Sequence, residues 1–116
     1  AEGETSFRSF MYGPGLSLTR VTGKMLGVSI QTLTPIDDEK CEVVHTYYAA
    51  KSAPATKAEL EGFFDYYASD WELDFGLWNT KVYRPQPLLA ENDGDVGRFR
   101  RWYKQFYSTD VGIDKF

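Results

Sequence analysis

One carboxylate stands among apolar side chains in the stretch from Thr56 to Asn79, and this placement could support chemistry. At about 100° per residue on an α-helix, Asp74 falls within roughly 40° of an apolar stripe. The stripe consists of Leu60, Phe64, Tyr67, Trp71 and Trp78. An ionised carboxylate is very costly to bury unless it is paired or coordinates a metal. Asp74 is therefore either a structural carboxylate, exposed at an edge or paired with an arginine or a tyrosine hydroxyl, or a metal ligand or general base.

The chain has a single histidine, His45, and a single cysteine, Cys41. One histidine, one cysteine and scattered carboxylates do not complete a zinc or iron site. Cys41 has no base spaced to activate it, and no G-x-S-x-G motif is present. We expect His45 to be a hydrogen-bonded residue of a strand and Cys41 to be buried or partly buried in the same strand. The lone cysteine excludes an intrachain disulfide and is compatible with a reducing compartment, so we expect a cytoplasmic location.

The strands that position these residues are predicted from the alternation of polar and apolar residues and from turn residues between them. Alternating stretches predict strands at 5–12, 16–22, 25–34 and 41–50. In the third strand, Val28 and Ile30 share one face and Ser29 and Gln31 share the other. The fourth strand carries apolar groups on both faces, which favours a central position covered on both sides. Gly13-Pro14-Gly15-Leu16 suits a type II turn with Gly15 at positive φ.

Two helices are predicted after the strands. Thr56-Lys-Ala-Glu59 has the capping-box pattern at the start of a long amphipathic helix over 56–79. Its outer face carries Glu61, Asp65, Ser69, Glu72 and Gly76. Residues 80–94 contain two prolines and are predicted to be an extended arm, and 95–107 forms the second helix. The apolar stripe of that helix is Val96, Phe99, Tyr103 and Phe106, with Trp102 beside it.

Length and composition fit one small domain, 1–116. Hydrophobic residues make up 42% and aromatic residues 16% of the chain, so a core is possible. Sequential hairpins followed by a long helix predict an α+β fold, an antiparallel sheet with the helix packed across one face and a cavity between them. The net charge of −4 makes nucleic acid a poor partner, and no apolar run is long enough to span a membrane.

The second helix carries a basic run interleaved with aromatic residues. Its cations are Arg98, Arg100, Arg101 and Lys104. They form either a solvated face whose aliphatic stems cover apolar surface or a docking surface for an acidic partner.

Several stretches together resemble one known family. They are Tyr12-Gly-Pro-Gly-Leu16, Leu33-Thr-Pro-Ile-Asp37, Leu73-Asp-Phe-Gly-Leu-Trp-Asn-Thr-Lys81, and the C-terminal Pro87-Leu-Leu, Asn92-Asp-Gly and Arg98–Tyr107. Val44-His-Thr-Tyr-Tyr48 adds to the set. In this order and spacing they resemble the C-terminal part of the catalytic domain of Rieske-type non-haem iron oxygenases, in the branch of 3-ketosteroid 9α-hydroxylase oxygenases and cholesterol 7-desaturases. The resemblance implies a helix-grip, START-like fold.

The resemblance also implies a role for Asp74. In that family, an Asp four residues before a Trp on a long helix is the carboxylate of a two-histidine, one-carboxylate iron site, and Asp74 and Trp78 match this pattern. Leu73 stands where the family has a polar residue. The family's two iron-ligating histidines lie well upstream and have no counterpart here. Its Rieske cluster requires two cysteines and two histidines in a separate domain.

We therefore expect a partial catalytic domain without a Rieske domain, inactive alone, that supplies one iron ligand and part of a hydrophobic pocket. The pocket candidates are Phe64, Tyr67, Trp71, Trp78, His45 and Tyr47. The family implies Fe(II) and a Rieske [2Fe-2S] cluster, neither of which we expect this chain alone to bind. It also implies a steroid or aromatic substrate and a ferredoxin or reductase partner. Whether the chain is itself an enzyme stays open.

Two other interpretations stay open. One is a free-standing helix-grip module that binds a hydrophobic small molecule without catalysis. The other is an assembly piece whose exposed sheet edge pairs with a second copy, and for this reason we expect a homo-oligomer.

Overall fold

The computed structural model describes residues 4–107. Four strands come first, and their bounds are β1 (Ser6–Met11), β2 (Leu16–Thr22), β3 (Gly27–Pro35) and β4 (Cys41–Ala49). The short 3₁₀ helix η1 (Gly23–Met25) separates β2 from β3. The helices α1 (Lys57–Trp78) and α2 (Val96–Tyr103) and the 3₁₀ helix η2 (Lys104–Phe106) follow. The predicted α+β class and the predicted order of elements are confirmed.

The sheet is an antiparallel meander in which every strand pairs with the next, in the order β1-β2-β3-β4. The register aligns Ser9, Thr19, Ser29 and Tyr47 in one row across the four strands. A neighbouring row aligns Met11, Ser17, Gln31 and His45. Side chains two residues apart on a strand point to the same side, so both rows lie on one face of the sheet.

The helix α1 begins with the predicted capping box. The Thr56 hydroxyl accepts from the Glu59 backbone N–H at 3.4 Å, and the Glu59 carboxylate accepts from the Thr56 backbone N–H at 2.9 Å. Lys24 of η1 also donates to Glu59, at 2.5 Å. Together the hydrogen bonds from Lys24 and Thr56 lower the pKa of Glu59 to about 2. One carboxylate thus closes the first turn of α1 and ties it to the turn between β2 and β3.

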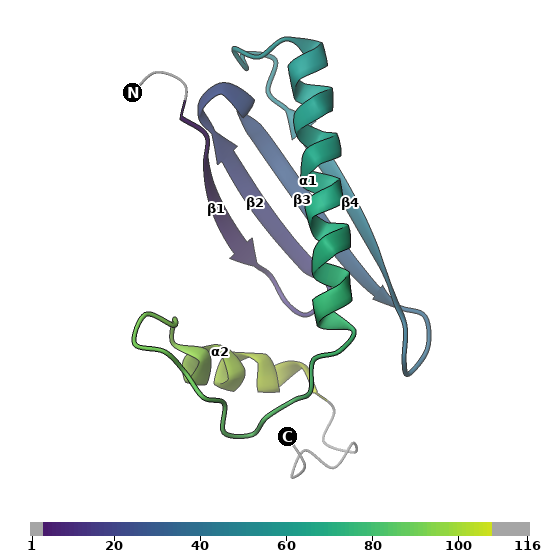
Figure 1. Cartoon of the computed structure of the whole chain (residues 1–116), viewed down its shortest axis with the longest axis vertical. Helices are drawn as coiled ribbons and strands as arrows, with labels where there is room; N and C mark the ends of the chain where they lie inside the picture. The colour runs from purple at the N-terminus through teal and green to yellow at the C-terminus, as the bar shows by residue number, and fades with distance from the viewer. Residues whose placement is uncertain (1–3, 108–116) are drawn as a thin grey trace.

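α1 lies across one face of the sheet (Figure 1), as predicted. Its aromatic side chains meet those of both edge strands. The Tyr67 ring lies 6.2 Å from the Phe7 ring of β1, and the Phe63 ring lies 5.6 Å from the Tyr47 ring of β4. All five residues assigned to the outer face of the helix are exposed. The sequence-based assignment of the two faces of α1 therefore holds, except that Trp78 of the predicted inner stripe is 40% exposed.

The face of the sheet beneath α1 is lined with polar side chains, which form what we call the polar floor. Ser29 is fully buried, Gln31 is 1% exposed and Thr19 is 5% exposed, whereas Val21 is the one hydrophobic residue buried to this degree among residues 4–107. Val28 and Ile30, on the other face, are only half-buried. The helix thus covers the polar side of β3. Polar groups are tolerated there because they bond to one another, as described below.

The arm and α2 follow α1 and lie beyond one end of the sheet (Figure 1). Residues 80–94 form neither helix nor strand, as predicted. The Asp95 carboxylate caps α2 by accepting from the Arg98 backbone N–H at 2.7 Å. At the end of η2, the Phe106 ring lies against Gly13, since a Cβ placed on Gly13 would be 3.7 Å from it.

Three expectations are wrong. Positive φ occurs at Gly13 (134°) and not at Gly15, because the left-handed residue of this turn precedes Pro14 instead of following it. β4 is an edge strand of the described sheet, and α1 covers only one of its faces, so Tyr48 on the other is 60% exposed. Cys41 is exposed because it begins that edge strand.

Candidate functional site

Asp74 follows Trp71 by three residues on α1, and the Trp71 ring packs on His45 of β4. The Asp74 side chain is half-buried. Within residues 4–107, no side chain or backbone group is within hydrogen-bond or ion-pair distance of its carboxylate. The structural alternative of a carboxylate paired with an arginine or a tyrosine hydroxyl therefore has no support in the described part. Asp74 stands on the inner face with its full capacity to accept a donor or a cation.

His45 is held by the polar floor. Its Nε2 lies 2.5 Å from the Ser29 hydroxyl and 2.7 Å from the Gln31 side-chain nitrogen, which also donates to Ser29 at 2.9 Å. The amide oxygen of Gln31 accepts from the Ser17 hydroxyl at 2.8 Å. Since an amide nitrogen only donates, Nε2 of His45 accepts, and the ring is neutral with its proton on Nδ1. Burial acts in the same direction and lowers the pKa of His45.

Aromatic rings from α1 surround His45. The ring centroids of Tyr67 and Trp71 lie 4.9 and 5.0 Å from that of His45, and Phe64 lies 6.3 Å away. Tyr47 stacks on Phe64 at 6.4 Å and donates to the Met25 carbonyl. The structure thus brings five of the six pocket candidates together, where they fill the space between α1 and the sheet.

The sixth candidate, Trp78, lines a groove beyond this aromatic cluster. The groove has a volume of about 500 Å³ and lies where the end of α1 meets the β3–β4 hairpin. Phe75 and Trp78 form its helical wall and Leu33 and Val43 its strand wall. Glu39, Lys40 and Cys41 add polar groups at the hairpin side. Phe75, the residue after Asp74, lines the groove, whereas Asp74 itself does not.

No group of three or more His, Cys, Asp and Glu side chains suited to a metal ion is present in the part that the structure describes. In this same part, His45 is engaged by Ser29 and Gln31. In the same described part, no helix is both long enough and apolar enough to cross a bilayer.

Sequence reasoning missed the polar partners of His45. Ser17 and Gln31 lie opposite each other on β2 and β3, and Gln31 lies opposite His45. The signal was present in the sequence, since Ser29 and Gln31 alternate with Val28 and Ile30, but the side on which α1 lies is fixed only by the tertiary structure.

An antiparallel four-stranded sheet with a long helix across one face defines an α+β domain. The sequence model of the family 3-ketosteroid 9α-hydroxylase C-terminal domain matches residues 1–107. The chain belongs to this family of Rieske-type oxygenases. The resemblance inferred from the sequence blocks is thereby confirmed.

Individual relatives agree with the family. The chain is 33% identical to cholesterol 7-desaturase nvd 1 of Ciona intestinalis over 104 residues, covering 87% of this chain and 21% of that protein. It is 35% identical to cholesterol 7-desaturase nvd of Drosophila melanogaster, covering 80% of this chain and 25% of that protein. It is 28% identical to a 3-ketosteroid-9-alpha-monooxygenase oxygenase component of Rhodococcus rhodochrous, covering 83% of this chain and 27% of that protein. The chain thus spans about a quarter of these relatives. No solved structure matches significantly.

Proposed function

We propose that this chain forms the C-terminal part of the catalytic domain of a steroid-type Rieske oxygenase, in which Asp74 is the carboxylate ligand of a mononuclear iron. The observation that carries the proposal is the position of Asp74. It is half-buried on the inner face of α1, has no partner in residues 4–107, and stands four residues before Trp78. Burying part of a carboxylate without a partner is unfavourable, and a cation would remove that cost.

The fit to iron is partial. A facial triad needs two histidines beside the carboxylate, and the described part of the chain has only His45, whose Nε2 is occupied by the polar floor. Because the 116 residues contain one histidine, His45, the two histidine ligands would have to come from another part of a longer protein. When bound, the iron would supply O₂ activation, with electrons from a reductase by way of a Rieske cluster. This chain's own residues would supply one iron ligand, Asp74, and would exclude water from one side of the metal.

The substrate would be a hydrophobic small molecule, a steroid or an aromatic compound. Support comes from the groove at the end of α1, whose apolar walls are Leu33, Val43, Phe75 and Trp78 and whose volume suits a small molecule. The sheet with α1 across it agrees with the helix-grip, START-like arrangement that the family implies. The cytoplasmic location and the homo-oligomer stay predictions.

Metal analysis of the longest gene product that contains this chain tests the proposal. The variant Asp74→Asn keeps the size of the side chain and removes its charge. The matched control is Asp65→Asn, on the opposite, exposed face of α1. We expect the wild type and Asp65→Asn to contain iron and Asp74→Asn to lose most of it. On the 116-residue chain, Asp74→Asn should change the free energy of unfolding by less than about 0.5 kcal/mol, because no partner is lost.

Two results would overturn the assignment. One is an Asp74→Asn protein that retains iron at the level of Asp65→Asn. The other is a gene product in which no iron is present at any stage of purification under anaerobic conditions. The stability measurement separates loss of a ligand from loss of the fold, since an unfolded variant would lose metal for a trivial reason.

A second candidate function is favoured by the same groove: a module that binds a hydrophobic small molecule without catalysis. It requires no iron, so it predicts that steroids or aromatic compounds raise the melting temperature of Asp74→Asn as much as that of the wild type. Trp78→Ala should abolish the shift. If no steroid or aromatic compound raises the melting temperature of the wild type, this candidate fails.

A further inference from the structure

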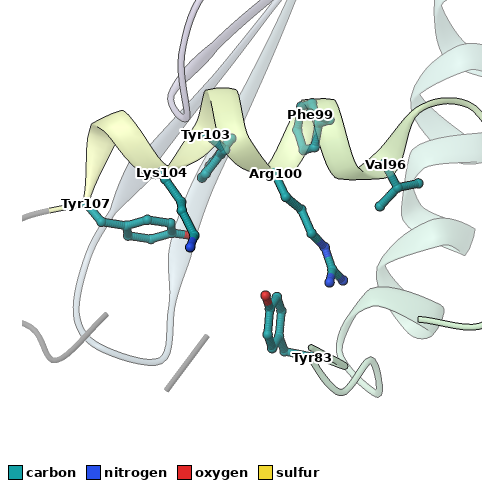
Figure 2. A pocket seen from close by; sticks show the side chains of 7 residues that line it. All are labelled: Tyr83, Val96, Phe99, Arg100, Tyr103, Lys104 and Tyr107. Carbon is teal, nitrogen blue, oxygen red and sulfur yellow. The ribbon is translucent and has the colours of Figure 1, made fainter. Parts of the chain in front are cut away.

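We propose that the groove between α2 and the preceding arm binds a small amphipathic carboxylate, that is, an aromatic or alicyclic ring system bearing one carboxylate group. The groove has a volume of about 410 Å³, and Figure 2 shows its lining side chains. Tyr83 of the arm and Phe99 and Tyr103 of α2 form aromatic walls. It shares no lining residue with the groove at the end of α1, and Asp74 does not line it, so this site is separate from the proposed iron ligand.

The groove is built by specific contacts between α2 and the arm. The Arg100 guanidinium donates to the Arg84 carbonyl at 2.7 Å and to the Pro85 carbonyl at 3.1 Å. It also lies over the Tyr83 ring, 4.6 Å from the ring centroid. These contacts fix one wall against the other before any ligand arrives. Less ordering is then needed on binding, which favours affinity.

The charge of the groove selects an anion. Its charged lining residues are Arg100 and Lys104, and no carboxylate lines it. Lys104 has no ion-pair partner in the range 4–107. Burial, and secondarily Tyr107, raise the pKa of Tyr103, so its hydroxyl stays protonated and able to donate. A ligand with an apolar body and one carboxylate matches aromatic walls beside an ammonium group.

The spacing of the cations favours a small ligand over a polymer. Lys104 supplies one ammonium group to the groove, whereas the Arg100 guanidinium is engaged by the Arg84 and Pro85 carbonyls, so the groove is matched to a single carboxylate. Arg98 and Arg101 are about 160° and 100° around the helix from Arg100, so no row of cations runs along the groove as a polyanion would need. The volume lies within the range of small-molecule sites.

Calorimetric titration of the full 116-residue chain with two matched probes tests the proposal. The probes are 1-naphthaleneacetate and 1-naphthaleneacetamide, which share the ring system and differ in charge. We expect the acetate to bind about tenfold more tightly than the amide, as a charge-assisted hydrogen bond predicts. Lys104→Gln should remove that preference and leave the affinity for the amide unchanged. The control Arg98→Gln, whose side chain does not line the groove, should keep it.

Amide NMR shifts locate the probe, and we expect the largest shifts at Phe99 and Tyr103. Equal affinity for the two probes would overturn the proposal, as would equal losses in Lys104→Gln and Arg98→Gln. Shifts centred on Phe75 and Trp78 instead would assign the binding to the other groove and would also refute it. Sedimentation tests whether a second copy occupies the groove instead. Self-association through α2 that Lys104→Gln disrupts and neither probe affects would identify a second copy as the occupant and would reject the carboxylate.

Discussion

The hydrogen bonds of Gln31 offer a quantitative test of the polar floor. Gln31 is 1% exposed and takes part in three hydrogen bonds, to Ser17, Ser29 and His45. Gln31→Met keeps a long, flexible side chain of similar size and removes every polar atom. Ser29 and His45 retain each other at 2.5 Å, so neither is left without a partner. The Ser17 hydroxyl loses its acceptor but is only half-buried and can reach water.

The expected loss follows from these bonds. A typical intramolecular hydrogen bond contributes about 1 kcal/mol net, and a buried group left unpaired costs about 1–3 kcal/mol. With three bonds removed and no partner fully orphaned, we expect Gln31→Met to lower the free energy of unfolding by about 3 kcal/mol. Urea denaturation followed by far-ultraviolet circular dichroism measures this loss. Gln86→Met, in the exposed arm, is the matched control and should stay within about 0.5 kcal/mol of the wild type.

A double-mutant cycle with Ser17→Ala isolates one bond of the polar floor. If Gln31 and Ser17 interact as described, Ser17→Ala should cost less in the Gln31→Met background than in the wild type. The reasoning is refuted if Gln31→Met is as stable as the wild type or more stable. That outcome would mean that an apolar floor beneath α1 serves the fold equally well and that the polar bonds are not needed for stability.

Three further predictions concern stability. Burial lowers the pKa of His45, so the fold is fully stable above the unfolded pKa of about 6.5 and loses stability as pH falls below it. Denaturation between about pH 7 and pH 5 should therefore show a free energy of unfolding that decreases as pH falls. His45→Gln should flatten this dependence. Thr56→Ala removes the N-cap of α1 and should cost about 1 kcal/mol of unfolding free energy, whereas Ser52→Ala, at an exposed position between β4 and α1, should cost nothing measurable. Equal effects would contradict the cap. Gly62→Ala lies in α1 with nothing within 4 Å of the added Cβ and should raise thermal stability by about 0.5–1 kcal/mol; a loss would show an unseen contact.

The local elements were predictable because their signals are local. The capping box at Thr56 marks the start of α1, and the spacing of Leu60, Phe64, Tyr67 and Trp71 marks its inner face. Each of these signals depends on residues within one or two turns of each other. The position of Asp74 on that face was predictable for the same reason.

What could not be predicted depends on the side on which α1 lies. Alternation along β3 defines two faces, one with Val28 and Ile30 and one with Ser29 and Gln31, and hydrophobicity alone favours burial of the first. The structure buries the second because Ser29 and Gln31 find partners in His45 and each other. The edge position of β4 and the exposure of Cys41 likewise depend on which strands pair, which no short window of sequence records.

The meander order of the sheet has a consequence for folding kinetics. Each strand pairs with its neighbour in sequence across a connection of four or five residues, namely 12–15, 23–26 and 36–40. Closing loops of this length costs little entropy, and folds dominated by such local pairings form quickly. During synthesis, all four strands leave the ribosome before α1 does. The sheet can therefore pair first, and the arrival of α1 is the step that seals Ser29, Gln31 and His45 from water.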